Sequence, residues 1–341
     1  MEVGAKSVPE INASLPPPPS SCFLSVSEER VESKTAHSMT KKRLSVKAWK
    51  GNVSSKLQNR MKALSWRGRY TNEEYYPAEV LGKSFRVLQT PCGEMKGLGT
   101  GSTVWDGGQV LMKFIEHRYK ESGLQGKSVI DLGSGTGIVG LAAAVLGADR
   151  VVLTGYRTPP LLSFFKVSDF LLLLLLLYFL LLYFLLISIS GSDQKQVLHI
   201  ARENVASCAK EVGDKSIQKR VSVAEYDWGD KTSSSKLRAP FDIILVADCI
   251  VPKLYPMQPL VDALLEVSGS DSTILICYDH RVNHVLDPRV KFRELCEDAG
   301  FSFKVVPHSQ HHPDYVLEEC SMWELKLNSR NSNGSKRKGK Q

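Results

Sequence analysis

The sequence lacks the cysteine pattern of a disulfide framework or a zinc site. Its seven cysteines lie far apart, their number is odd, and no two form a C-x-x-C pair. Dispersed thiols of this kind are typical of a reducing compartment. The neighbouring His311 and His312 have no cysteine or acidic residue nearby at metal-ligand spacing, so we interpret them as part of a polar loop. We therefore expect no metal site.

A secretory signal is also missing from the sequence. The first residues include Glu2 and Glu10 and contain no apolar run of the kind that a signal peptide needs. Early acidic residues argue against a transit peptide as well. We therefore expect a cytoplasmic or nuclear protein, unless an internal apolar segment is a genuine membrane span.

The first feature that the sequence does contain is a polar N-terminal tail. Residues 1–65 are rich in Ser, Pro and Lys, include the run Pro16–Pro19, and show no sustained apolar periodicity. This composition predicts disorder. The net charge of +8 is concentrated in residues 40–69 and in the basic tail 328–341. We favour solvated tails for these runs, and a nucleic-acid partner remains an alternative.

Strands that alternate with helices follow this tail and predict one α/β domain over residues 77–327. The expected strands are 128–132, 150–154, 221–228, 241–247, 273–278, 301–306 and 322–327. The expected helices are 104–119, 138–146, 194–209, 257–267 and 289–299. Only the loop 308–319 separates the last two strands, which predicts an antiparallel last strand in an otherwise parallel, Rossmann-like seven-strand sheet.

An apolar segment interrupts this alternation. Residues 170–187 are almost entirely Leu, Phe and Tyr, and about 18 apolar residues suffice for a transmembrane helix. The surrounding stretch 155–192, however, stands where a strand-to-helix connection normally has about 2 to 6 residues. Without it, Thr154 is followed at once by Asp193. We favour an insertion from a retained intron, because pyrimidine-rich codons encode Leu, Phe, Ser and Tyr; a genuine membrane span is the alternative.

The main candidate site is the loop from Asp131 to Gly137, with the sequence DLGSGTG, which joins a strand to a helix. Glycines allow the backbone to turn sharply and to approach a ligand closely. The helix N-terminus offers N–H groups and partial positive charge, which suit a carboxylate. A dinucleotide pyrophosphate would be repelled by Asp131, whereas the ammonium and sulfonium groups of S-adenosylmethionine would be attracted. We therefore predict a methyltransferase loop in which Asp131, Gly133, Ser134, Gly135 and Gly137 bind this cofactor.

Further candidates follow the later strands, at the edge where open parallel sheets bind ligands. With 155–192 removed, Asp193 lies close to the spacing of about 20 residues expected for an acid that binds ribose hydroxyls; it is equally suited to be a helix cap. Trp228 can stack on adenine or pack in the core, and Asp227 can accept from the adenine amine. Ala247 and Asp248 close the fourth strand. Trp105 stands just before the first helix and either covers the cofactor or staples that helix.

Together these stretches resemble the lysine-directed seven-strand methyltransferases, methyltransferase family 16, and within it the protein-lysine N-methyltransferase branch. The resemblance covers about residues 85–327 without the apolar insert and rests on Val104 to Asp106, Asp131 to Gly137, Asp193-Gln194, Asp227 to Gly229 and Val246 to Asp248. It implies a class I methyltransferase sheet, cofactor contacts from Trp105, Gly133, Ser134, Gly135, Asp193, Trp228 and Ala247, and a protein-lysine substrate.

The chain departs from the family where an aromatic residue should follow the acid. Val251 stands three residues after Asp248, and Tyr255 comes four residues later. For catalysis we expect Asp248 to orient the amine, with Tyr278, Asp279 and His280 as weaker candidates. His280 is expected to accept the proton of the amine, because imidazole titrates near neutral pH; a solvent-facing loop histidine is the alternative.

Two rival functions remain open at this point. One is a nucleic-acid or small-molecule methyltransferase, although no Asn-Pro-Pro-Tyr sequence follows the fourth strand. The other is a form that the insert deprives of its cofactor or anchors in a membrane. We expect a monomer.

Overall fold

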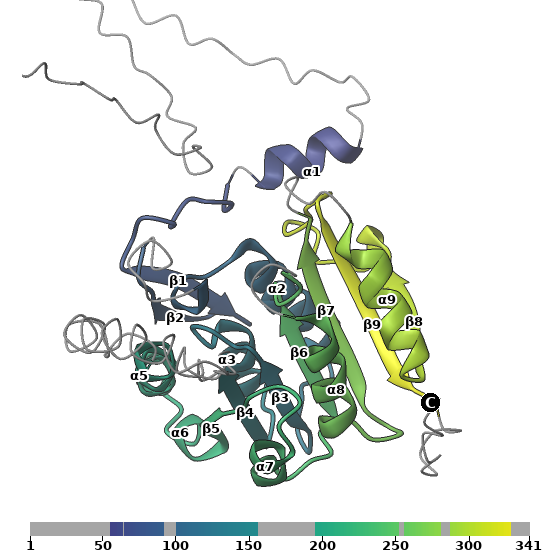
Figure 1. Ribbon diagram of the computed structural model, residues 1–341. Helices are drawn as coiled ribbons and strands as arrows, with labels where there is room; N and C mark the ends of the chain where they lie inside the picture. The colour runs from purple at the N-terminus through teal and green to yellow at the C-terminus, as the bar shows by residue number, and fades with distance from the viewer. Residues whose placement is uncertain are drawn as a thin grey trace, which may run out of the picture. The chain divides into compact units, whose positions relative to one another are not determined.

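The computed structural model describes residues 55–63, 65–91, 100–155, 195–251, 256–280 and 287–328 (Figure 1). Several expectations from the sequence lie outside these residues. They are the tail up to residue 54, nearly all of the apolar segment 155–192, Asp193, Tyr255, and the basic tail after Asn328.

A seven-stranded sheet forms the centre of the domain, with the strand order β5-β4-β3-β6-β7-β9-β8. The first five strands of this order pair in parallel, and β9 runs antiparallel to both β7 and β8. This confirms the Rossmann-like α/β class and the antiparallel last strand. The strands are β3 (Ser128–Leu132), β4 (Arg150–Gly155), β5 (Val221–Glu225), β6 (Ile243–Ala247), β7 (Thr273–Asp279), β8 (Phe301–Val306) and β9 (Cys320–Leu327).

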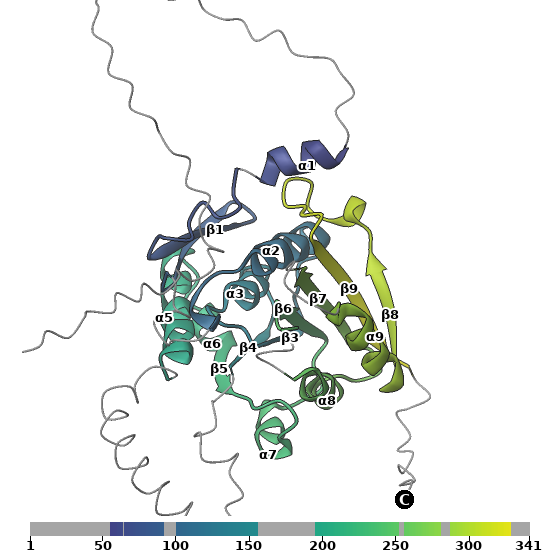
Figure 2. The ribbon, with the colours of Figure 1, turned by 45° about the horizontal axis from the view of Figure 1, so that its top comes forward.

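Helices cover both faces of the sheet, as Figures 1 and 2 show. One face carries α2 (Asp106–Tyr119), α3 (Ile138–Val145) and α5 (Lys195–Glu211). The other carries α8 (Met257–Val267) and α9 (Pro288–Asp298). The short helices are α6 (Ile217–Arg220), α7 (Lys231–Ser234), η1 (Thr100–Ser102), η3 (Ser235–Leu237) and η4 (His308–Gln310).

Alternating side chains in the strands build the two halves of the core. In β3, Val129 packs with the α2/α3 side and Ile130 with the α8/α9 side, and both are fully buried. In β6, Ile243 and Ile244 divide in the same way. Strands buried on both faces have continuous apolar sequence, and this is why β3 and β6 were recognisable from the sequence.

A hairpin that the sequence did not predict precedes this sheet. It consists of β1 (Tyr75–Val80) and β2 (Lys83–Leu88), which pair antiparallel. In β1, Tyr76, Ala78 and Val80 are buried and alternate with exposed residues. The hairpin packs its apolar face on the same core as α2 and α3, so the folded domain begins before residue 77.

Helix α1 (Ser55–Ala63) corrects the expected disorder of residues 1–65 at its C-terminal end. Its last residue, Ala63, and the following Trp66 are buried. Burial of these two side chains holds a helix whose other residues are mostly polar. The chain divides into Met1–Gly51 and Asn52–Gln341, and the first of these units lies outside the described residues.

One strand ends earlier than expected. Strand β5 ends at Glu225, so the expected strand 221–228 is wrong in its last residues, and Asp227 and Trp228 lie in the following turn.

Within the described residues, no helix has the length and apolar character required to cross a membrane. Residues 170–187 are not among those searched.

Candidate active site

The site lies at the switch point of the sheet, where the strands that follow β3 are placed first on one side of it and then on the other. From β3 the order runs to β4 and β5 on one side, whereas β6 and β7 follow on the other. In open α/β sheets, a ligand crevice forms at the carboxyl ends of the two strands that flank such a switch point. Here those strands are β3, which is followed by the glycine loop, and β6, which is followed by Asp248.

The glycine loop, residues 133–137, depends on backbone that side chains would obstruct. Gly133, Gly135 and Gly137 all have positive φ angles, of 67°, 54° and 85°. A Cβ atom on Gly135 would lie 2.7 Å from the carbonyl oxygen of Gly101 in η1. The loop therefore packs directly against the backbone of η1, and glycine is required there both by conformation and by space.

Asp131 is buried beneath the loop with only 1% of its surface exposed. Its Oδ2 accepts a hydrogen bond of 2.9 Å from the N–H of Gly140, in the first turn of α3. Burial raises the pKa of Asp131 to about 7, and the Gly140 hydrogen bond opposes this rise. The structure thus gives Asp131 a positioning contact to α3, and its contact with a cofactor stays a prediction.

Two polar residues that the sequence analysis did not select support the loop from behind. Thr154 is fully buried at the end of β4; its hydroxyl donates to Asp131 O, and its carbonyl accepts from the N–H of Ser134 at 2.8 Å. Asn204 of α5 donates to Thr136 O at 2.9 Å and exchanges two hydrogen bonds with the backbone of Leu88. A polar residue closing an apolar strand was a usable signal for Thr154, whereas the role of Asn204 arises from tertiary contacts alone.

Trp228 and Cys249 close the other side of the loop. A Cβ atom on Gly133 would lie 2.7 Å from Cys249 Sγ and 3.1 Å from the indole of Trp228. Trp228 is half-buried. It packs against the α8/α9 core and at the same time lies beside the glycine loop. Asp227 stands in the same turn, and its carbonyl accepts from the N–H of Asp230.

Trp105 belongs to the turn that leads into α2. Its indole N–H donates to Thr100 O at 2.6 Å, and its backbone forms the N-cap of the helix. This contact ties Trp105 to η1, which itself packs against the glycine loop. The two expected roles of Trp105, covering the cofactor and stapling the helix, both stay predictions.

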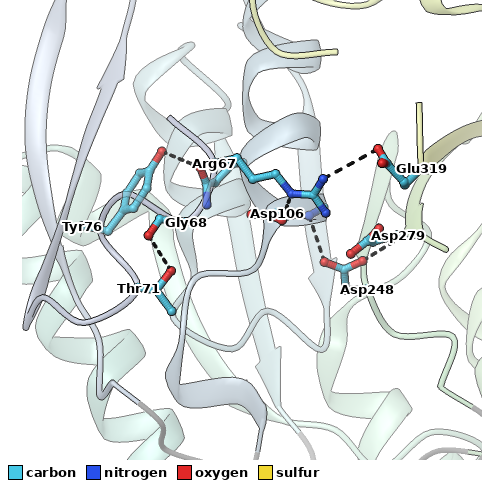
Figure 3. Close-up of polar contacts among 10 residues, drawn as sticks. Arg67, Gly68, Thr71, Tyr76, Asp106, Asp248, Asp279 and Glu319 are labelled. Carbon is cyan, nitrogen blue, oxygen red and sulfur yellow. Dashed lines mark hydrogen bonds and ion pairs between the residues drawn. The ribbon is translucent and has the colours of Figure 1, made fainter. Parts of the chain in front are cut away.

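Asp248 joins three elements at the carboxyl end of β6 (Figure 3). Its Oδ2 accepts from the N–H of Gly107 in α2 at 2.9 Å, and its Oδ1 accepts from the N–H of Asp279 at 3.0 Å. Its own backbone has a φ of 54°, which is strained for a residue with a side chain. A Cβ atom on Gly107 would lie 2.5 Å from both carboxylate oxygens. Asp248 therefore positions α2 against β7.

His280 directly follows Asp279, the residue whose N–H donates to Asp248. The N–H of His280 donates to Glu319 O at 2.8 Å. The expected roles of Asp248 and His280 toward an amine stay predictions. Ala247, the last residue of β6, is half-buried, and its carbonyl oxygen lies 3.3 Å from Cys249 Sγ. Within the described part of the chain, no cluster of residues is suited to hold a metal ion.

A family model described as lysine methyltransferase matches residues 90–163 and 180–291, more than half of the sequence. The chain belongs to this family. The match includes the glycine loop, Trp228 and Asp248, and the interval between its two parts, 164–179, falls inside the stretch 155–192 that contains the apolar segment. Membership in the lysine methyltransferase family confirms the resemblance that the motifs indicated.

Curated members of the lysine methyltransferase family match part of the chain. Protein N-lysine methyltransferase METTL21A of Danio rerio is 28% identical over 184 residues, which cover 54% of this chain and 62% of that protein. METTL21A of Mus musculus is 29% identical over 183 residues, with the same coverage. EEF1A lysine methyltransferase 3 of Xenopus tropicalis is 36% identical over 85 residues, which cover 25% of this chain and 34% of that protein. The chain thus spans about three fifths of the length of the METTL21A proteins.

Proposed function

We propose that the protein transfers a methyl group from S-adenosylmethionine to the side-chain amine of lysine in a protein substrate. The observation that carries this proposal is the glycine loop at the switch point of a lysine methyltransferase family sheet. The names of the matched relatives, which are protein-lysine methyltransferases, support a protein substrate over a nucleic acid.

The residues of the loop fit the methionine end of the cofactor. The first N–H groups of a helix have no acceptor within it. In α3, Gly140 is bonded to Asp131, whereas the N–H groups of Ile138 and Val139 have no bonded acceptor among the described residues. These donors and the helix dipole suit a carboxylate. Gly133, Ser134 and Gly135 would hold the methionine portion, Trp228 and Trp105 would flank the cofactor, and Asp193 would bind the ribose.

The chemistry asks little of the protein beyond alignment. The cofactor supplies an activated methyl group on a sulfonium, and the attacking lysine must approach in line and without its proton. The carboxyl ends of β6 and β7 present Asp248 and His280 on the side of the switch point away from β4. Asp248 joins α2 to β7 at this edge of the sheet, and His280, which follows β7, would take the proton.

Labelled S-adenosylmethionine and a cell extract test the proposal. Incubation with the protein should label extract proteins, and the label should survive nuclease, disappear with protease, and map to lysine by mass spectrometry. Gly135→Ala is the inactive control, because its Cβ would meet Gly101 O. Gly82→Ala is the matched control, because Gly82 also has positive φ but nothing within 4 Å of its Cβ. Label that nuclease removes and protease does not remove would instead support a nucleic-acid substrate.

The apolar segment calls for a separate comparison. The chain with residues 155–192 deleted should bind S-adenosylmethionine more tightly than the full chain, because the deletion restores a short connection between β4 and α5. Calorimetry on both chains measures this difference. Equal, tight binding would refute the idea that the segment impairs the site.

A further inference from the structure

A segment before the hairpin, residues 65–73, crosses the molecule close to the candidate site; we call it the strap. Trp66 anchors one end, with 5% of its surface exposed. Its indole N–H donates to Asp314 O at 2.8 Å, and its ring stacks on Tyr315 with 4.8 Å between centroids. The other end is held by the buried side chain of Gln89, which donates to two strap carbonyls. The position of Arg67 between these anchors is therefore well defined.

Arg67 extends from the strap to two acidic residues beside the candidate catalytic pair (Figure 3). Its Nε donates to Asp106 Oδ2 at 2.9 Å, and its terminal nitrogen lies 3.7 Å from Glu319 Oε2. The residue after Asp106 donates its N–H to Asp248, and the carbonyl of Glu319 accepts from His280. Each partner of Arg67 thus adjoins one of the two residues expected to act on the amine.

Several negatively charged side chains lie around Arg67. The groups that face Arg67 are Asp106 from α2, Glu319 from the loop before β9, and Asp279 from the end of β7. The carboxylate of Asp248, from the end of β6, lies directly below, bonded to the backbone of Asp279. We call these four carboxylates the acidic cluster. Arg67 contributes a positive charge to it, with 39% of its side chain exposed.

These charges act in opposite directions on an arriving lysine. Carboxylates favour its ammonium form, which binds well but cannot attack a methyl group because its lone pair holds a proton. A guanidinium nearby favours the neutral amine, because two like charges repel each other. The balance between Arg67 and the acidic cluster therefore determines what fraction of bound lysine is ready to react.

We propose that Arg67 keeps the target lysine reactive by offsetting the acidic cluster, so that the cluster attracts the lysine without holding it in its protonated form. This inference rests on the proposed function and adds to it a residue that sets the pH range of the reaction. Arg67 acts through the local field and touches neither lysine nor cofactor in this account.

The test compares Arg67→Gln, Arg67→Lys and the full wild-type chain. The substrate is the extract protein that the labelling experiment marks most strongly, purified and used at saturating concentration from about pH 6 to about pH 10. Arg69→Gln is the matched control, because Arg69 is two residues along the strap and lies over the ring of Tyr70, 5.5 Å from its centroid. Glu319→Gln is the opposite change, since it removes one negative charge.

With Arg67→Gln, the acid limb of the kcat profile should move to higher pH by about 0.5 to 1 unit, so that kcat falls about three- to tenfold at low pH and recovers at high pH. KM should not rise. Arg67→Lys and Arg69→Gln should leave the limb in place, and Glu319→Gln should move it to lower pH. A fall in kcat that is equal at every pH, or a higher KM with an unmoved limb, would overturn the inference.

Failure of the proposed function has a different signature. In that case the wild-type chain labels no protein lysine, and this is seen before any variant is compared. If Arg67→Gln does not fold, as judged by its thermal unfolding and cofactor binding, Glu319→Gln decides alone, and an unmoved limb overturns the inference.

Discussion

The two sides of the switch point are built on different principles. The glycine loop after β3 is held by backbone contacts, with Gly135 against Gly101 and buried polar groups behind it. The acidic cluster after β6 and β7 consists of half-exposed carboxylates with a guanidinium among them. Steric fit dominates the first side and charge the second. A substitution should therefore affect cofactor binding on one side and the chemistry of the amine on the other.

The largest expected effect tests the steric side. Gly135→Ala should weaken S-adenosylmethionine binding by about a hundredfold or more, because its φ of 54° and its distance of 2.7 Å to Gly101 O both oppose a side chain. Calorimetry measures the affinity. Gly82→Ala, with the same left-handed backbone and open surroundings, should bind the cofactor as the wild type does. Equal losses in both variants would show that backbone conformation and not contact is responsible.

A smaller effect is expected at Gly107, the glycine that packs against the carboxylate of Asp248 on the charged side. Gly107→Ala should displace the carboxylate of Asp248 and lower kcat about ten- to a hundredfold, with cofactor affinity changed less than about threefold. Steady-state kinetics and calorimetry separate the two quantities. The neighbouring Gly108→Ala is the control, because its Cβ would lie 3.6 Å from Ile138, an ordinary contact. A fall in cofactor affinity as large as the fall in kcat would show that the charged side also determines cofactor binding, contrary to the comparison.

The smallest effect concerns Asp131, an ionisable group buried on the steric side. The pKa of Asp131 is raised to about 7 in the folded protein, from 3.8. Its ionisation therefore destabilises the fold as pH rises from about 4 through about 7. Asp131→Asn can keep the bond from Gly140 without this cost, so its free energy of unfolding relative to wild type should be higher at pH 8 than at pH 5 by about 1 to 2 kcal/mol.

Denaturant unfolding at the two pH values measures the Asp131 effect. The same substitution on the charged side, Asp279→Asn, is the control, since Asp279 is half-buried. A relative stability of Asp131→Asn that does not change with pH would mean that folding does not raise the pKa of Asp131.

Much of the fold was predictable because the buried strands are continuous apolar runs. Strands β3 and β8 and helix α8 have the bounds expected from the sequence. The hairpin β1–β2 was missed because its strands are short, half-exposed and, in β1, interrupted by Pro77. Helix α1 was missed because its sequence is mostly polar, and it is held at its end by the burial of Ala63 and Trp66.

The site was predictable to the extent that it is local in sequence. The glycine loop lies within seven consecutive residues, from Asp131 to Gly137, and its type of backbone is encoded by its glycines. Asp248 was recognisable as an acid after an apolar strand, but its bond to Gly107 spans 141 positions. The ion pair of Arg67 with Glu319 joins residues even farther apart, and no local pattern encodes it.

The place of β9 has a consequence for how the protein is made. This strand follows all the other strands of the sheet in chain order, yet it lies inside the sheet between β7 and β8. Until it is synthesised, β7 is an open edge, and the aromatic cluster around Trp323, with Tyr278, Phe292 and Phe303, has no centre. The nascent sheet therefore exposes apolar surface and an unpaired edge until β9 is synthesised, and this is the stage of folding at which aggregation is most favoured.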